Sequence, residues 1–336
     1  MIKNILISVV CASLAVLTVI DGSGVITSVK NAAYVCLDTI VPSLFGFMFI
    51  STFLLNSGAY RIVLKPFCFL LRPMLKMSDE QIAVFLLSVV GGYPVGVKLL
   101  SERDYPKKTS EKMLGFCYCG GPLFLSGIIG ASLFGDTRFG LYAYAANVAA
   151  CFTLALFYKE SEQETKPKHK DKYDISIRVF ASSVTSAGYA LFPVCFMILA
   201  FNSFIELTRF IGVDSPLLYS LMEISNIKNA AMSLPVAAAV SSFGGVCIVA
   251  QVAALCEGKF SLTRFLLMRI PAAALSAVYT LLLMKLLGSP TVAAIARVEP
   301  VSFSSHNIMA SLFLVLMCGI LVADFSPSKI DKQANK

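Results

Sequence analysis

Glycine and proline interrupt two apolar stretches of this 336-residue chain, and unwound backbone in such a setting can hold a ligand. The first interruption contains Gly91, Gly92, Tyr93, Pro94, Gly96 and Lys98. The second contains Ser241, Ser242, Gly244, Gly245 and Gln251. Glycine relaxes the backbone and proline removes a hydrogen-bond donor, so we expect a helix to break at each diglycine. Two half-helix N-termini meeting near the bilayer midplane would bind a small anion.

Other features near these breaks have two interpretations each. The glycines themselves could instead only permit close helix packing. A third break, Cys119-Gly120-Gly121-Pro122 with Ser126 one turn later, either points another helix N-terminus at the same cavity or is an ordinary helix start. Lys98 either pairs with an anionic ligand or extends to the membrane surface. We take Gly120, Gly121, Ser126 and Lys98 as candidate binding residues.

Glu223 is the acidic candidate, in the segment MEISNIKNAA that precedes the second interruption. An ionisable residue at membrane depth is a functional candidate by default, so Glu223, with Ser225 and Asn226 beside it, is a candidate site for a coupling cation or a proton. In the alternative, Glu223 lies at the membrane surface with Lys228 or water as its partner. Gln251 either donates to a ligand or bonds a neighbouring helix.

Enzymatic chemistry is poorly supported by the residue types. The only histidines are His169 and His306, and no pair of nucleophile and base stands out. The ten cysteines lie almost entirely in apolar runs, and Cys117-Tyr-Cys119 is too closely spaced for a zinc site. We therefore expect no catalytic residue, no metal and no cofactor. In a membrane protein a net charge of +8 mainly reflects the basic loops that set the orientation in the bilayer. We therefore expect no nucleic-acid partner.

Composition defines the class of protein. Apolar residues make up 57% of the chain and charged residues 14%, with a mean hydropathy of +0.77. Soluble domains carry roughly 25% charged residues, so a soluble globule is excluded and the bilayer is the expected partner. We predict an all-α integral membrane protein with inverted-topology repeats, about seven transmembrane helices and two re-entrant helical hairpins. The expected spans are residues 4–20, 39–55, 113–134, 140–158, 190–204, 271–287 and 307–323.

A charged segment divides the chain. The expected parts are an uncleaved signal-anchor helix at 1–27, a first membrane repeat at 28–158 with a hairpin near 81–102, a charged cytoplasmic linker at 159–174, a second membrane repeat at 175–325 with a hairpin near 229–256, and a polar tail at 326–336. Basic residues flank the first hairpin on both sides, which favours a hairpin that enters and leaves from the cytoplasm. This topology places the basic tail outside, which disagrees with the positive-inside rule.

The two halves share landmarks in the same order. Pro42 is followed by Pro193 at an offset of 151 residues, and Gly91 by Gly244 at an offset of 153. Counted from a cytoplasmic N-terminus, the expected spans start the first repeat outside, after the signal-anchor helix, and place the charged linker in the cytoplasm. The second repeat would therefore start on the opposite side of the membrane from the first, which predicts an inverted repeat.

Four motifs follow one another along the chain: GYPVG with Lys98, GPLF, Glu223-Ile224-Ser225, and FGG with Gln251. In this order they resemble the motifs of sporulation integral membrane proteins of the YlbJ (SpoVV) type. Those proteins contain a nucleoside-recognition or Gate domain, similar to the core of concentrative nucleoside transporters. The resemblance spans roughly residues 30 to 290. The chain departs from the pattern at Gly91, Cys119-Gly120 and Cys247, where more polar residues are expected.

The resemblance implies a multi-pass protein of a mother-cell or forespore membrane that moves dipicolinic acid, a small aromatic dicarboxylate, during sporulation. We therefore expect a transporter for a small organic anion, with or without a coupling ion. A nucleoside or nucleobase transporter and a non-transporting membrane assembly factor in spore formation are the alternatives. A homo-oligomer is compatible with all of them.

Overall fold

The computed structural model describes residues 22–158, 173–210, 212–213 and 215–288, with scattered positions between 8 and 20. The chain divides into two units, Met1–Arg297 and Val298–Lys336, and all the described residues belong to the first. The expected linker at 159–174, the span at 307–323 and the tail at 326–336 lie outside the described residues, except for the last two positions of the linker. Residues 1–7, 9–10, 14, 17 and 21 of the expected signal-anchor segment do as well.

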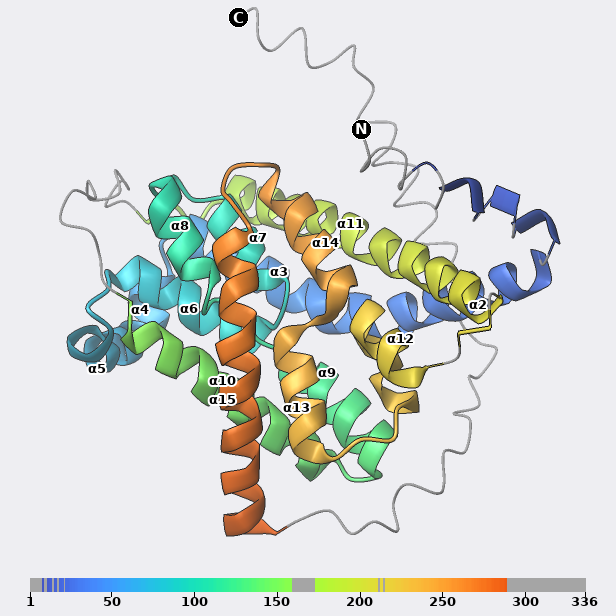
Figure 1. The fold of residues 1–336 in the computed structure, drawn as a ribbon. Helices are drawn as coiled ribbons and strands as arrows, with labels where there is room; N and C mark the ends of the chain where they lie inside the picture. The colour runs from blue at the N-terminus through green and yellow to red at the C-terminus, as the bar shows by residue number, and fades with distance from the viewer. Residues whose placement is uncertain are drawn as a thin grey trace, which may run out of the picture. The chain divides into compact units, whose positions relative to one another are not determined.

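The described residues form helices and no strands, as the sequence predicts (Figure 1). Five helices are long and apolar enough to cross a membrane: Gly22–Asn56, Thr137–Leu156, Ile177–Phe210, Leu234–Cys256 and Thr263–Leu287. The chain is therefore a multi-pass integral membrane protein. One expected span is wrong: residues 113–134 are not continuous, because the chain leaves the helix before Gly120-Gly121-Pro122, and only Pro122–Leu133 continues as an apolar helix.

Two long helices lie side by side and run antiparallel. The first consists of α2 (Gly22–Val35), η1 (Cys36–Ile40) and α3 (Val41–Asn56), and the second is α11 (Ile177–Phe210). The Ser28 hydroxyl donates to the Asn202 carbonyl at 3.1 Å, and at the far end the Phe49 and Phe180 rings meet with centroids 5.0 Å apart. Residue numbers therefore rise along one helix as they fall along the other.

The first diglycine follows α6 (Asp79–Gly91), which begins at a capping box between Ser78 and Gln81. The short basic helices α4 (Tyr60–Val63) and α5 (Lys65–Leu75) precede it, and α7 (Val95–Ser101) and α8 (Lys107–Leu114) follow. Helix α7 folds back on α6, since a Cβ placed on Gly96 would lie 2.6 Å from the Cβ of Ser88.

The second diglycine separates α13 (Leu234–Phe243) from α14 (Gly245–Cys256). Helices α12 (Pro216–Met222) and η3 (Ile224–Asn229) precede α13. Helix α14 continues onward from α13 in Figure 1, and the two together are long enough to form one interrupted crossing.

Helices α10 (Thr137–Leu156), α13 and α15 (Thr263–Leu287) pack against one another, next to the short helix made of α9 (Pro122–Phe124) and η2 (Leu125–Leu133). A buried polar cluster joins them: the Asn147 amide donates to Ser241 at 3.1 Å, and the Ser276 hydroxyl donates to the Asn147 amide oxygen. Because lipid offers polar groups no partner, such bonds fix the relative placement of membrane helices.

Candidate functional site

Both diglycine positions interrupt helices, as the sequence predicts. Gly92 ends α6 with φ +78°, and Gly244 separates α13 from α14 with φ +95°. L-residues with side chains rarely adopt these values. A Cβ on Gly92 would lie 2.5 Å from the Cα of Gly121, so the α6–α7 turn touches the third glycine break directly.

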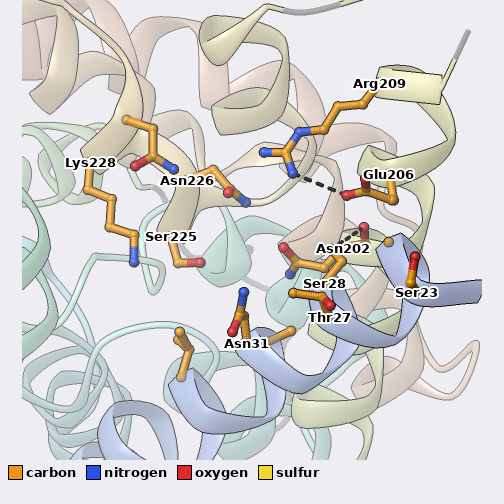
Figure 2. Close-up of a pocket in the computed structure, with 14 residues that line it drawn as sticks. Ser23, Thr27, Ser28, Asn31, Asn202, Glu206, Arg209, Ser225, Asn226 and Lys228 are labelled. Atoms are coloured by element: carbon orange, nitrogen blue, oxygen red, sulfur yellow. Dashed lines mark hydrogen bonds and ion pairs between the residues drawn. The ribbon is translucent and has the colours of Figure 1, made fainter. Parts of the chain in front are cut away.

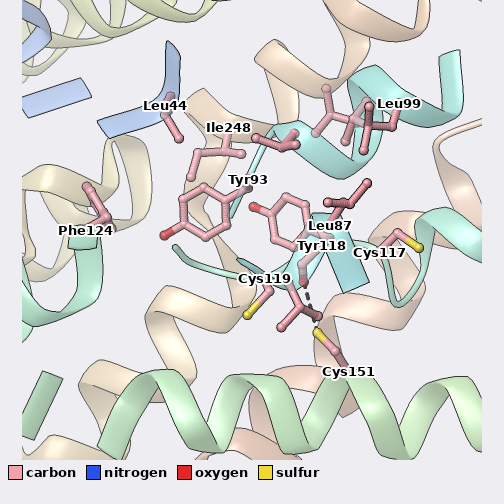
Figure 3. Packing of buried hydrophobic residues seen from close by; sticks show 14 of the residues in the cluster. Leu44, Leu87, Tyr93, Leu99, Cys117, Tyr118, Cys119, Phe124, Cys151 and Ile248 are labelled. Carbon is pink, nitrogen blue, oxygen red and sulfur yellow. Dashed lines mark hydrogen bonds between the residues drawn. The ribbon is translucent and has the colours of Figure 1, made fainter. Parts of the chain in front are cut away.

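Tyr118 joins the two interruptions. Its ring stacks on that of Tyr93, with centroids 5.1 Å apart and planes 25° apart (Figure 3). On its other side the Tyr118 hydroxyl lies against Gly244, where a Cβ would come within 1.7 Å of the oxygen. Both tyrosines are buried, and within the described part of the chain neither hydroxyl has a hydrogen-bond partner. The segment between α8 and α9 therefore fills the space between the two breaks.

Arg269, in the second turn of α15, is fully buried and holds this segment in place. Its guanidinium lies 4.4 Å from the Tyr118 ring centroid and donates to the carbonyls of Tyr118 and Ser242, each at 3.4 Å, and to that of Gly115. No sequence prediction included this residue. Its position directly before a stretch without charges, at 270–284, was the signal for it.

A small inner cavity lies where the breaks meet the long helices. Its lining residues are Ile40, Ser43, Leu44, Tyr93, Gly121, Phe124, Val194, Ile198, Glu223, Ile224, Ile248 and Gln251. Four predicted binding residues are among them: Tyr93, Gly121, Glu223 and Gln251. The cavity volume is about 30 Å³, which is room for little more than a water molecule.

Glu223 is the only charged residue in that lining. Its carboxylate accepts the Ser225 backbone N–H at 3.1 Å, the Asn226 amide at 3.2 Å and the Ser225 hydroxyl. The side chain is buried, and among the described residues no ion pair reaches it, Lys228 included. Lys228 therefore acts on this carboxylate electrostatically but without a direct ion pair.

Lys98 lies elsewhere. Its ammonium is buried between α3 and α7, where it donates to the Thr52 hydroxyl at 2.6 Å and to the Glu102 carboxylate at 2.9 Å. The Ser186 hydroxyl of α11 donates to the same Glu102 carboxylate. This cluster, which we call the Lys98 cluster (Thr52, Lys98, Glu102 and Ser186), joins the two long helices at the end away from Ser28.

The other predicted residues serve helix contacts or line the larger pocket described next. Gln251 donates to the Val194 carbonyl at 3.5 Å, so it also ties α14 to α11. The small residues Gly91, Gly96, Gly120 and Gly245 permit close approaches to Val95, the Cys117 carbonyl, Leu125 and the Leu221 carbonyl, respectively. The backbone of Ser126 lies against Gly140 of α10. Pro94 is the N-cap of α7. Ser242, the last but one residue of α13, accepts a hydrogen bond from Arg269 through its carbonyl.

Ser225 and Asn226 face a larger pocket of about 480 Å³, which we call the vestibule (Figure 2). Its walls are α2 along its whole length, the last turns of α11, and η3. Along the first long helix, Asn31 and Val35 line the vestibule and Ile40 and Ser43 line the inner cavity. The two spaces therefore follow one groove, and the Glu223–Asn226 segment separates them.

The chain is similar to a curated protein with the printed name sporulation integral membrane protein YlbJ, from Bacillus subtilis (strain 168). The two are 24% identical over an alignment of 308 positions, and the match covers 74% of this chain and 74% of that protein. No family model matches the chain, and no solved structure matches it. This multi-pass membrane protein is thus a distant homologue of the sporulation integral membrane protein YlbJ.

Proposed function

We propose that the chain is a membrane carrier for a small organic anion, with the inner cavity as its central binding site. One observation carries this proposal: a single cavity touches both helix interruptions, through Tyr93 and Ile248, and both long helices, through Ile40 and Val194. Broken helices around a central site between repeats are typical of secondary transporters.

The long helices support an inverted repeat. Ser28 meets Asn202, and with an offset of about 151 residues these positions correspond to Val179 and Ser51, close to the Phe49–Phe180 contact at the opposite end. Corresponding contacts at opposite ends of an antiparallel pair are what a two-fold axis in the membrane plane produces. Rocking of one half against the other would then open each end in turn.

The ends of this groove differ, which supports an asymmetric transport state. The vestibule is open next to Ser28, and the Lys98 cluster closes the groove at the other end. The closed end carries Arg61, Lys65, Arg72, Lys76 and Arg103, so the positive-inside rule assigns it to the cytoplasm. The structure then corresponds to a state open to the outside, with the inner cavity collapsed.

Glu223 suggests how transport is coupled. A buried carboxylate repels a second carboxylate at close range, where the effective dielectric constant is low. An organic anion would therefore occupy the cavity together with a proton or a cation at Glu223. The sporulation name of the distant homologue, and the resemblance to carriers of dipicolinic acid, support dipicolinate as the first anion to test.

A nucleoside or nucleobase is the second candidate, because the cavity offers one carboxylate (Glu223), one amide (Gln251) and two hydroxyls (Ser43 and Tyr93), and no cation. Such a set suits the hydrogen-bonding groups of a neutral ligand. The experiment is uptake of dipicolinate, succinate and uridine into proteoliposomes that contain the purified protein. Uptake of the dicarboxylates alone supports the proposal, uptake of uridine alone favours the alternative, and uptake of neither favours a membrane assembly factor.

A further inference from the structure

The vestibule differs from the inner cavity in both size and charge. At about 480 Å³ it falls in the range of small-molecule sites, whereas the inner cavity of about 30 Å³ does not. In this conformation a molecule with a six-membered ring fits the vestibule and is excluded from the cavity. A ligand that reaches the cavity must therefore first occupy the vestibule.

The charged side chains of the vestibule leave one cation unmatched. Arg209 is paired with Glu206 at 3.1 Å, so these two charges offset each other. Lys228 is half-buried on η3, and within the described part of the chain it forms no hydrogen bond or direct ion pair. Its charge is attracted by that of Glu223, which lies outside the vestibule lining. The titratable groups around it are Glu206 and Arg209 in the vestibule and Glu223 beyond Ser225.

Neutral donors lie next to this cation. Figure 2 shows Lys228, Ser225 and Asn226 of η3 on one side of the vestibule and Asn31 of α2 on another. Ammonium, amide and hydroxyl groups are hydrogen-bond donors to carboxylate oxygens, and charge-assisted bonds are the strongest of them. A cationic ligand would find only Glu206, which Arg209 already neutralises.

We propose that the vestibule is a first binding site for a carboxylate anion, held by Lys228, from which the ligand moves past Glu223 into the inner cavity. This inference rests on the proposed function. Lys228 selects a negatively charged ligand before the collapsed cavity opens. This explains how a cavity that is lined by no cation can still receive an anion. The same chemistry would also hold the phosphate of an anionic lipid, so the test separates the two sources.

The test uses the full-length protein in vesicles of neutral phosphatidylcholine, with dipicolinate and its uncharged diamide as probes. We expect Lys228→Met to raise the KM for dipicolinate uptake about tenfold and to leave the maximal rate largely unchanged, because a charge-assisted hydrogen bond is worth about 1.4 kcal/mol or more. Lys228→Arg should retain most of the affinity. Lys285→Met, which removes an exposed lysine outside the vestibule, should behave as wild type.

Each outcome decides something. Wild-type uptake with an unchanged KM in Lys228→Met overturns the vestibule site and leaves the carrier intact. No wild-type uptake of any dicarboxylate overturns both proposals. Direct binding of dipicolinate that is lost when phosphatidylglycerol is added, in the wild type but not in Lys228→Met, assigns the vestibule to lipid and overturns the substrate site. Binding of the diamide as tightly as dipicolinate overturns the role of charge.

Discussion

The guanidinium of Arg269 lies 4.4 Å from the ring centroid of Tyr118, although 151 residues separate them in the chain. Tyr118 in turn contacts Tyr93 at one helix break and Gly244 at the other. One buried cation thus supports the segment that spaces the two interruptions. Any movement of α15 would be transmitted to both breaks through this ring.

Arg269→Met should destabilise the protein strongly. It leaves the carbonyls of Gly115, Tyr118 and Ser242 without this donor and removes a buried cation–π contact. We expect a loss of roughly 3 kcal/mol, seen as a lower apparent Tm in detergent. Arg264→Met, which changes an exposed arginine one and a half turns earlier on α15, is the matched control. Equal melting of both variants would remove Arg269 from its supporting role.

Gly244→Ala should abolish uptake, because the new Cβ would meet the Tyr118 hydroxyl at 1.7 Å and because alanine disfavours φ +95°. The variant should still insert into the membrane, and fluorescence size-exclusion chromatography checks that. Adding Tyr118→Phe removes the clashing oxygen and should restore part of the activity, while the backbone strain of about 1 kcal/mol stays.

Gly188→Ala is the control for that variant, since a Cβ at Gly188 meets nothing within 4 Å. We expect its uptake to equal that of the wild type. If Gly244→Ala also transports at the wild-type rate, the close contact between Tyr118 and the second break has no part in transport.

Glu223→Gln should uncouple transport from its driving ion. Glutamine has nearly the same shape and keeps one acceptor for the Ser225 hydroxyl or backbone N–H, but it neither takes up a proton nor neutralises a cation. Uptake in proteoliposomes should then respond neither to an imposed pH gradient nor to a Na⁺ gradient, whichever of the two drives the wild type. Glu257→Gln changes an exposed carboxylate and should leave the response intact. An unaltered gradient response in Glu223→Gln would exclude Glu223 as the coupling group.

The two ends of the long helices should face opposite sides of the membrane. Asp174 donates its backbone N–H to the Ser57 carbonyl at 3.1 Å, so the start of the second half lies beside the end of α3. A membrane-impermeant maleimide added to intact cells should label Ser23→Cys above the wild-type background and should spare Tyr173→Cys. Labelling of Tyr173→Cys alone would reverse the orientation proposed here and place the vestibule in the cytoplasm.

The sequence by itself determined the class of protein and the location of the breaks. A chain with 57% apolar and 14% charged residues must bury its surface in lipid, and lipid forces the backbone into helices. The diglycines at 91–92 and 244–245 mark the helix ends because backbone preference is a local property. Glu223 stood out for a similar reason: a charge within a largely apolar region is visible without any knowledge of the fold.

Only the tertiary structure decided which of these residues meet. Lys98 and Glu223 are both charged groups near a break, yet one joins two helices at the end of a groove and the other lines the inner cavity. Arg269 acquires its supporting role from hydrogen-bond partners on distant segments. Lys228 acquires its proposed role from its place in the vestibule wall, where no direct ion pair holds it among the described residues. Such pairings depend on how helices far apart in the chain pack, and the apolar periodicity that predicts a helix carries no information about its neighbour.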